Sequence, residues 1–306
     1  MKSSSNKRPA THAGSWYDDD PSALSKEIEK YISSAQESKT QFPNDKQLKA
    51  VIVPHAGYYY SGKTAGAAFI HLDPSLYDRV VVLGPSHYAS FLNCYVTSYE
   101  KYETPFGDID IDTDAIAQLI KTSGSLFKYA PKSADMEEHS IEMELPFIQY
   151  IFSQKKKNFK LIPIIVGFSN DNRSIASALN EFMNDDKTLI VISSDFCHWG
   201  KNFDYTYYDK SKGEIYKSIE FMDKMGIELM SKMKSKELDE YFEKYENTIC
   251  GRYPIEILMN YCEVNNIDES NAIFKCEKYT QSEKVTKKNQ NSVSYAGCVL
   301  FVAKKK

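Results

Sequence analysis

The sequence predicts a single α/β domain with a central mixed, mostly parallel sheet flanked by helices. Four short β-branched apolar runs alternate with segments whose apolar residues recur at helical spacing, which is typical of buried central strands. The chain has 306 residues and 42% hydrophobic residues, enough for one large core without a second domain. We therefore expect one domain over residues 9–303, after a disordered, polar and basic tail over residues 1–8.

Each predicted element follows from its own pattern of apolar residues. Short apolar runs predict central strands over 49–54, 79–84, 159–166 and 188–193, and two late strands near 272–279 and 292–302. Apolar residues at helical spacing predict helices over 21–35, 61–71, 112–122, 138–152, 172–183, 211–232 and 235–245.

The balance of charge weighs against a nucleic-acid partner. Lys and Arg number 38, Asp and Glu number 42, and the formal net charge is −4. The basic residues are scattered and form no dense stripe of the kind that binds a phosphate backbone. Three short Lys-rich segments, 155–157, 284–288 and 304–306, are expected to be solvated surface.

The apolar runs and the cysteines indicate an intracellular protein. No run is long enough to cross a bilayer, and the first residues lack the apolar stretch of a signal peptide. The six cysteines lie far apart without a CxxC pair, which argues against a disulfide framework and against a zinc ribbon. We expect a cytoplasmic protein with reduced thiols and no membrane span, and the nucleus as a further location.

Three of the six histidines follow the carboxyl ends of predicted strands. His55, His87 and His198 come after the predicted strands that end at residues 54, 84 and 193. Open α/β sheets build their ligand crevices at these strand ends. One such histidine alone is more often a capping or packing residue, but three together indicate ligands. Gly57 and Gly84 allow tight turns beside them.

Cys250 is the fourth candidate. It precedes a predicted helix that starts near Pro254, and Arg252 is close in sequence, a setting that favours a thiolate able to bind metal or attack an electrophile. The alternative is an inert buried thiol. We prefer that alternative for the other dispersed cysteines, Cys94, Cys262, Cys276 and Cys298.

Two further residues are candidates for handling protons. Asp195 lies three residues before His198 and could orient an imidazole or bind a cation, although an Asp after two serines could equally be a helix N-cap. His139 is expected in the first turn of the helix over 138–152, where it either reaches the pocket or lies at the surface.

The motifs that carry these residues resemble those of the Memo family, named for mediator of ErbB2-driven cell motility. They recur in order over almost the whole chain: THAGSWY at 11–17, PHAGY at 54–58, LGPSH at 83–87, EHSIEM at 138–143, SSDFCHWG at 193–200, TICGR at 248–252 and SVSYA at 292–296. So many matches in order make this resemblance specific.

The resemblance implies a fold similar to class III extradiol dioxygenases, whose non-haem iron is held by two histidines and a glutamate. His55 and His87 fall at the two histidine ligands, His198 at the acid/base, and Cys250 at the carboxylate ligand. A thiolate is softer than a carboxylate, so the resemblance implies copper, or iron with altered reactivity. We count His198 with the metal-binding residues as well, and Asp195 and His139 with the catalytic ones.

Three functions remain open from the sequence. In the first, His55, His87 and Cys250 bind iron or copper for redox or oxygen chemistry on a small molecule, an oxidoreductase activity linked through the family name to receptor signalling and motility. In the second, the crevice binds a phosphotyrosine peptide or signalling protein without catalysis. In the third, Cys250 is the nucleophile of a hydrolase, activated by His198 and Asp195. We place the metal hypothesis first.

Overall fold

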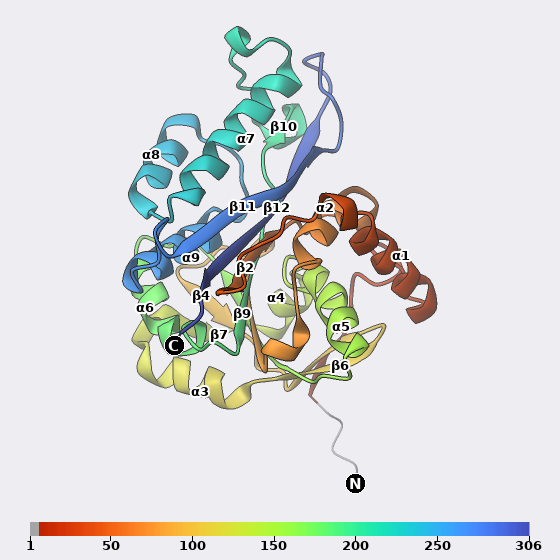
Figure 1. Cartoon of the computed structure of the whole chain (residues 1–306), viewed down its shortest axis with the longest axis vertical. Coiled ribbons are helices and arrows are strands. Elements are labelled where there is room, and N and C mark those ends of the chain that lie inside the picture. Colours follow the sequence, from red (N-terminus) through yellow and green to blue (C-terminus); the bar gives the residue numbers. More distant parts are fainter. Residues whose placement is uncertain (1–5, 306) are drawn as a thin grey trace.

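The structure is a computed structural model that describes residues 6–305. Its centre is four parallel strands in the order β8 (Lys160–Val166), β3 (Arg79–Pro85), β9 (Thr188–Ser193), β2 (Lys46–Val53). Most of their side chains are buried, because helices cover both faces of the sheet (Figure 1). The four predicted central strands are confirmed, each within three residues of its predicted bounds.

Antiparallel and short strands extend this centre on both sides. The main path of the sheet is β1-β5-β6-β8-β3-β9-β2-β12-β10, with β2 and β12 antiparallel. Off this path, β11 pairs with β12, and β4 pairs with β7 and β8. Both predicted late strands are confirmed, and they form a long antiparallel hairpin. The outer strands are β1 (Lys7–Arg8), β4 (Cys94–Val96), β5 (Lys101–Thr104), β6 (Gly107–Ile111), β7 (Phe127–Tyr129), β10 (His198–Trp199), β11 (Ala272–Gln281) and β12 (Ser292–Ala303).

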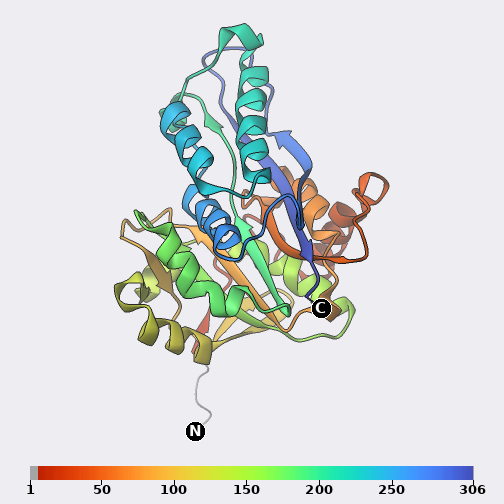
Figure 2. The same cartoon turned by 60° about the vertical axis from the view of Figure 1, so that its left-hand side comes forward.

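Helices pack on both faces, and α7 and α8 stand beside the β11–β12 hairpin at the top of Figure 1. Figure 2 shows α7, α8 and α9 stacked along one side of the molecule. The α-helices are α1 (Pro21–Ser33), α2 (Tyr58–Phe69), α3 (Thr113–Thr122), α4 (Lys132–Glu137), α5 (Leu145–Gln154), α6 (Asn172–Met183), α7 (Ile215–Ser231), α8 (Ser235–Tyr245) and α9 (Arg252–Val264). Short 3-10 turns occupy Gln36–Ser38, Pro74–Leu76, Gly124–Leu126, Glu142–Glu144, Lys201–Phe203 and Lys210–Lys212.

One predicted helix, over 138–152, is interrupted. α4 ends before Glu138, residues 138–141 are non-helical, and α5 begins only at Leu145, where Pro146 in the first turn favours a new start. The Glu138 carboxylate accepts the N–H of Ser140 at 2.9 Å, and such a local side-chain bond competes with helix continuation. His139 therefore lies in a turn and not in the first turn of a helix.

The N-terminal boundary also needs correction. Residues 1–5 of the predicted tail lie outside the described residues, but Lys7 and Arg8 form β1, which pairs in parallel with β5. Arg8 is only 1% exposed, and its guanidinium lies 2.7 Å from the Glu142 carboxylate. From the sequence, Arg8 was assigned to a disordered tail, because the buried carboxylate that it contacts, that of Glu142, is 134 residues away in the chain.

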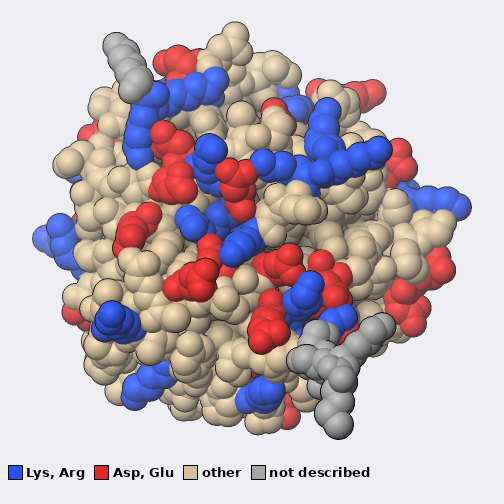
Figure 3. Space-filling view, turned by 90° about the horizontal axis from the view of Figure 1, so that it is seen from below, with Lys and Arg blue, Asp and Glu red and all other residues tan. Residues whose placement is uncertain are grey.

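The face of the molecule at which the central strands begin carries many charged side chains. Figure 3 views the molecule from below, where the central strands begin, and shows Lys and Arg intermingled with Asp and Glu. A cavity of about 690 Å³ on this side is lined by charges of both signs, including Arg79, Asp112 and Lys160, and holds none of the histidines. Within residues 6–305, no helix combines the length and the apolar character that crossing a membrane requires.

Candidate metal centre

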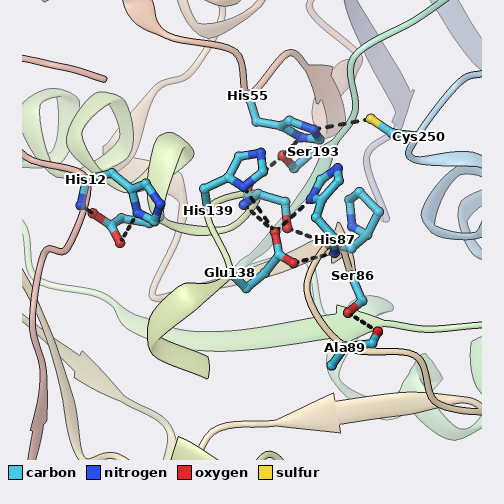
Figure 4. A network of polar contacts seen from close by, with 12 residues as sticks. His12, His55, Ser86, His87, Ala89, Glu138, His139, Ser193 and Cys250 are labelled. Carbon is cyan, nitrogen blue, oxygen red and sulfur yellow. Dashed lines mark hydrogen bonds and ion pairs between the residues drawn. The ribbon is translucent and has the colours of Figure 1, made fainter. Parts of the chain in front are cut away.

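The carboxyl ends of β2, β3 and β9 bring the predicted residues together. Since the three strands are parallel neighbours, the segments that follow them meet at one edge of the sheet. His55 follows β2, His87 follows β3, and Asp195 and His198 follow β9. Figure 4 shows the rings of His55, His87 and His139 turned toward one another.

Three of these residues form a compact set of possible ligands. One donor atom each from His55, His87 and Cys250 lies within 4.8 Å of the others. Cys250 comes from the turn before α9, and its Sγ is 3.2 Å from His55 Nε2 (Figure 4). Two imidazoles and a thiol are ligand types suited to iron, copper or zinc. His198 is not in this set, so its predicted role as a metal ligand has no support in the geometry.

Glu138 orients His87. Its carboxylate lies 2.9 Å from His87 Nδ1 and accepts the backbone N–H of His87 at 2.6 Å. Burial raises the pKa of Glu138, but the hydrogen bonds and charge of His87 outweigh it and lower that pKa to about 2. When the imidazole of His87 is neutral, the ionised carboxylate accepts from Nδ1–H, and the Nε2 lone pair is then free for a metal.

Ser193 orients His55. The Ser193 hydroxyl donates its one proton toward two acceptors, the Ser140 carbonyl at 2.6 Å and the Glu144 carboxyl at 2.9 Å. It therefore accepts from His55 Nδ1, which lies 2.7 Å away, and His55 keeps its Nε2 lone pair toward Cys250. Burial raises the pKa of Glu144 well above its ordinary value, so this carboxyl is neutral.

The Asp195 carboxylate hydrogen-bonds to the backbone of the turn at His55 and orients no imidazole. Its carboxylate accepts the N–H groups of His55 at 2.9 Å and Ala56 at 3.3 Å. Burial, opposed by these two bonds, raises the pKa of Asp195 to about 7. The helix-cap alternative is wrong, because the residues after Asp195 lead into β10 and not into a helix.

His198 and His139 line the cavity beside the ligand set. Two carbonyls, of Phe196 at 2.9 Å and Thr248 at 3.1 Å, approach His198 Nδ1, so Nδ1 carries the proton and Nε2 is the free acceptor. His139 stacks on His87, with ring centroids 4.4 Å apart, and burial followed by the charge of His87 lowers its pKa to about 4. The surface alternative for His139 is wrong, since it is 8% exposed.

Cys250 is not activated in the way the sequence suggested. Burial, and then the charge of Asp195, raise the pKa of the Cys250 thiol well above its ordinary value. Arg252 pairs with Glu256 at 2.7 Å and is unavailable to stabilise a thiolate. The imidazole beside the thiol belongs to His55 and not to His198, which the hydrolase hypothesis required. A cation in the ligand set would itself favour the thiolate.

The hydrogen-bond network around Glu142, next to the histidines, was not predicted from the sequence. Glu142 accepts from the Arg8 guanidinium at 2.7 Å, the backbone N–H of His12 at 2.8 Å and the Tyr17 hydroxyl at 2.9 Å. His12 Nδ1 is 3.0 Å away. The run at 11–17 contains His12 and Tyr17, but from the sequence it was interpreted only as a source of aromatic anchors. Five of the six histidines therefore surround this centre, and only His71 lies elsewhere.

The ionisation of Glu142 makes the stability of the folded protein depend on pH. Burial raises its pKa, but the hydrogen bonds of His12 and the charge of Arg8 lower it from 4.5 to about 2. The folded value lies below the unfolded one, so Glu142 contributes stability above about pH 4.5 and loses it as the pH falls toward 2.

We expect the difference in unfolding free energy between wild type and Glu142→Gln to shrink by up to about 3 kcal/mol between about pH 5 and pH 2. Urea titrations of both proteins across this range measure it. Glu269→Gln, at an exposed position, is the control for general acid destabilisation. A difference that does not change with pH would contradict the assignment.

Two cavities border the ligand set. The larger, about 500 Å³, is lined by Ser15, Trp16, His55, Ala56, Gly57, Tyr60, His87, His139, Asp195 and His198. The smaller, about 350 Å³, contains His87 and Cys250 together with aromatic residues such as Phe91 and Phe168. Gly57 is the N-cap of α2, while Gly84 lies within β3, where Ser140 packs so closely that a larger side chain would collide.

Comparison with known proteins agrees with the sequence motifs. A family described as Memo-like protein matches residues 8–299. Protein MEMO1 of Xenopus laevis is 39% identical over 297 residues, which cover 96% of this chain and 97% of the relative. Protein MEMO1 of Homo sapiens is 38% identical with the same coverage, and Protein memo-1 homolog of Caenorhabditis elegans is 38% identical over 96% of this chain and 83% of its own length. The chain therefore belongs to the Memo family.

Proposed function

We propose that the protein binds iron or copper through His55, His87 and Cys250 and uses it for redox or oxygen chemistry on a small molecule. The observation that carries this proposal is the compact donor set, with donor atoms within 4.8 Å of one another. Two of its members are already oriented as ligands, because Glu138 and Ser193 each occupy the Nδ1 side of an imidazole. His55 is buried, Cys250 is half-buried and His87 is open to solvent, and a set with both rings fixed is a preorganised site.

The donor types set the chemistry. A soft thiolate favours copper or a sulfur-ligated iron, in contrast to the two-histidine, one-carboxylate set of the extradiol dioxygenases, so their ring cleavage does not transfer. A redox metal held here would supply one-electron chemistry and activate oxygen. His198, with a free Nε2 on the cavity wall, is the group placed to accept a substrate proton, and neutral His139 forms a wall beside it.

The alternative function, a signalling adaptor that binds a phosphotyrosine peptide, has less support. Trp16 and Tyr60 give the larger cavity an aromatic side that suits a peptide, but no Lys or Arg among residues 6–305 lines it to bind a phosphate. A link to motility and receptor signalling rests on the family name. The cytoplasmic and nuclear locations, and the likeness to extradiol dioxygenases, likewise remain proposals.

Metal analysis by plasma mass spectrometry tests the proposal directly. The protein is purified without a metal-affinity tag and measured as isolated and after anaerobic reconstitution with ferrous or cuprous ions. Near-stoichiometric iron or copper supports the site, and oxygen consumption then becomes the assay. A folded protein that resists reconstitution with both metals would remove the redox proposal and leave the adaptor first.

Removing the hydroxyl behind His55 is expected to weaken metal binding without unfolding the protein. Ser193→Ala deletes the acceptor that fixes the His55 tautomer, and loss of such a partner lowers metal affinity by about 10–100-fold. Competition with a chromophoric chelator measures the affinity. Ser218→Ala, another buried serine, in α7, is the matched control and should bind metal like wild type. Equal affinities for Ser193→Ala and wild type would contradict this role.

A further inference from the structure

A second group of thiols lies away from the metal centre, on the β11–β12 hairpin. The antiparallel register places Cys276 directly opposite Cys298. Opposed residues in such a ladder have Cα atoms about 4.5–5.5 Å apart and side chains on the same face. Disulfides span Cα separations of about 4.4–6.8 Å, so the backbone already has the spacing of a disulfide.

The two thiols differ in a way that suits sequential oxidation. The Cys298 side chain hydrogen bonds to Cys276 and, against burial, lowers the pKa of Cys276. Burial raises the pKa of Cys298 well above its ordinary value. Cys276 is half-buried and reachable, whereas Cys298 beside it is fully buried. A more acidic, accessible thiol beside a protonated partner is the arrangement of an attacking and a resolving cysteine.

We propose that Cys276 and Cys298 form a redox-responsive dithiol that hydrogen peroxide converts into a cross-strand disulfide. The Cys276 thiolate attacks the peroxide O–O bond, giving a sulfenic acid and hydroxide. Cys298 then attacks that sulfur; the S–OH bond breaks, the hydroxyl leaves as water with the thiol proton of Cys298, and the S–S bond forms. Two thiols lose two electrons in all, and one peroxide is reduced to two waters.

The disulfide would restrain the strand that holds the His198 segment. Near its start, β12 accepts the N–H of Phe196 at Ser294 O, at 2.8 Å, and donates Ser294 N–H to Cys197 O, at 3.0 Å. β10, which begins with His198, also pairs with this part of β12. The ladder is irregular just after Cys276, so an added covalent bond would stiffen a point where the pairing is weak. This proposal does not depend on bound metal.

Peptide mapping tests it on the full-length protein. Reduced protein is treated with hydrogen peroxide, blocked with N-ethylmaleimide, unfolded and digested with trypsin, which places Cys276 in peptide 276–278 and Cys298 in peptide 289–304. We expect these two peptides to be joined, two of the six thiols to be lost, and dithiothreitol to reverse both changes. Cys276→Ser should abolish the linked peptide, and Cys250→Ser should retain it.

A further variant separates the two steps. In Cys298→Ala the resolving thiol is absent, so Cys276 should accumulate as a sulfenic acid that dimedone traps. Circular dichroism confirms that each variant is folded. The proposal is overturned if peroxide leaves Cys276 fully alkylated by maleimide, or oxidises it beyond the sulfenic acid in wild type without forming the linked peptide.

Discussion

The proposed iron or copper is expected to be lost almost completely in Cys250→Ser, with metal affinity lowered by more than about 100-fold, beyond the effect of removing an outer hydrogen-bond partner. Serine keeps the shape of the side chain but cannot supply a thiolate at neutral pH, so two imidazoles remain in a set that needs three donors. Metal content after dialysis against a weak chelator, measured by plasma mass spectrometry, gives the result.

Two comparisons make this result specific. His71→Gln removes the histidine that lies outside the centre, where it faces Glu277, and should leave metal content unchanged. Cys250→Asp creates two histidines and a carboxylate, the set typical of non-haem iron, and should retain ferrous iron while losing copper. If Cys250→Ser binds metal as tightly as wild type, the thiol is not a ligand.

Arg8→Met is expected to destabilise the protein by about 3–5 kcal/mol, the usual cost of breaking a buried ion pair from one side. Arg8 touches two buried carboxylates, Glu142 at 2.7 Å and Asp135 at 3.3 Å, and donates to the carbonyls of Asp135, Met136 and Glu138. Methionine fills similar space but leaves these acceptors without a donor. The midpoint of urea unfolding at neutral pH measures the loss.

Its neighbour supplies the control. Lys7 lies on the same two-residue strand and pairs with Asp108 at 2.6 Å, but both side chains are about 30% exposed, so Lys7→Met should cost no more than about 1 kcal/mol. The double variant Arg8→Met with Glu142→Gln should be less destabilised than the sum of the single variants. A small effect of Arg8→Met would mean that water enters this network and screens its charges.

The sequence predicted the centre of the fold because local patterns encode it. Each central strand is a short apolar run buried on both faces, and His55, His87 and His198 follow three of these runs. The three strands are parallel and adjacent in the order β3-β9-β2, so their carboxyl ends meet at one edge of the sheet. Cys250 was identified for its polar, glycine-turned surroundings, and the structure places it beside His55. The predicted support of its thiolate by Arg252 is wrong, because Arg252 pairs with another side chain, Glu256.

What the sequence could not provide are contacts between residues far apart in the chain. Ser193 reads as the end of a strand, and only the fold shows that its hydroxyl lies between His55 and Glu144. Arg8 reads as part of a basic tail until Glu142 is found beside it. Such polar groups leave no periodic signal, since their burial depends on single partners and not on a repeating face.

His87 lines both cavities, and this decides whether two small molecules can bind to the protein at the same time. His87 belongs to the wall of the 500 Å³ cavity and to that of the 350 Å³ cavity, whereas Cys250 borders only the smaller one. A molecule lodged in the larger cavity therefore leaves the thiol approachable through the smaller. We expect fragments chosen for the two cavities to bind to the same protein molecule together, and a linker passing His87 to join them into one bivalent ligand.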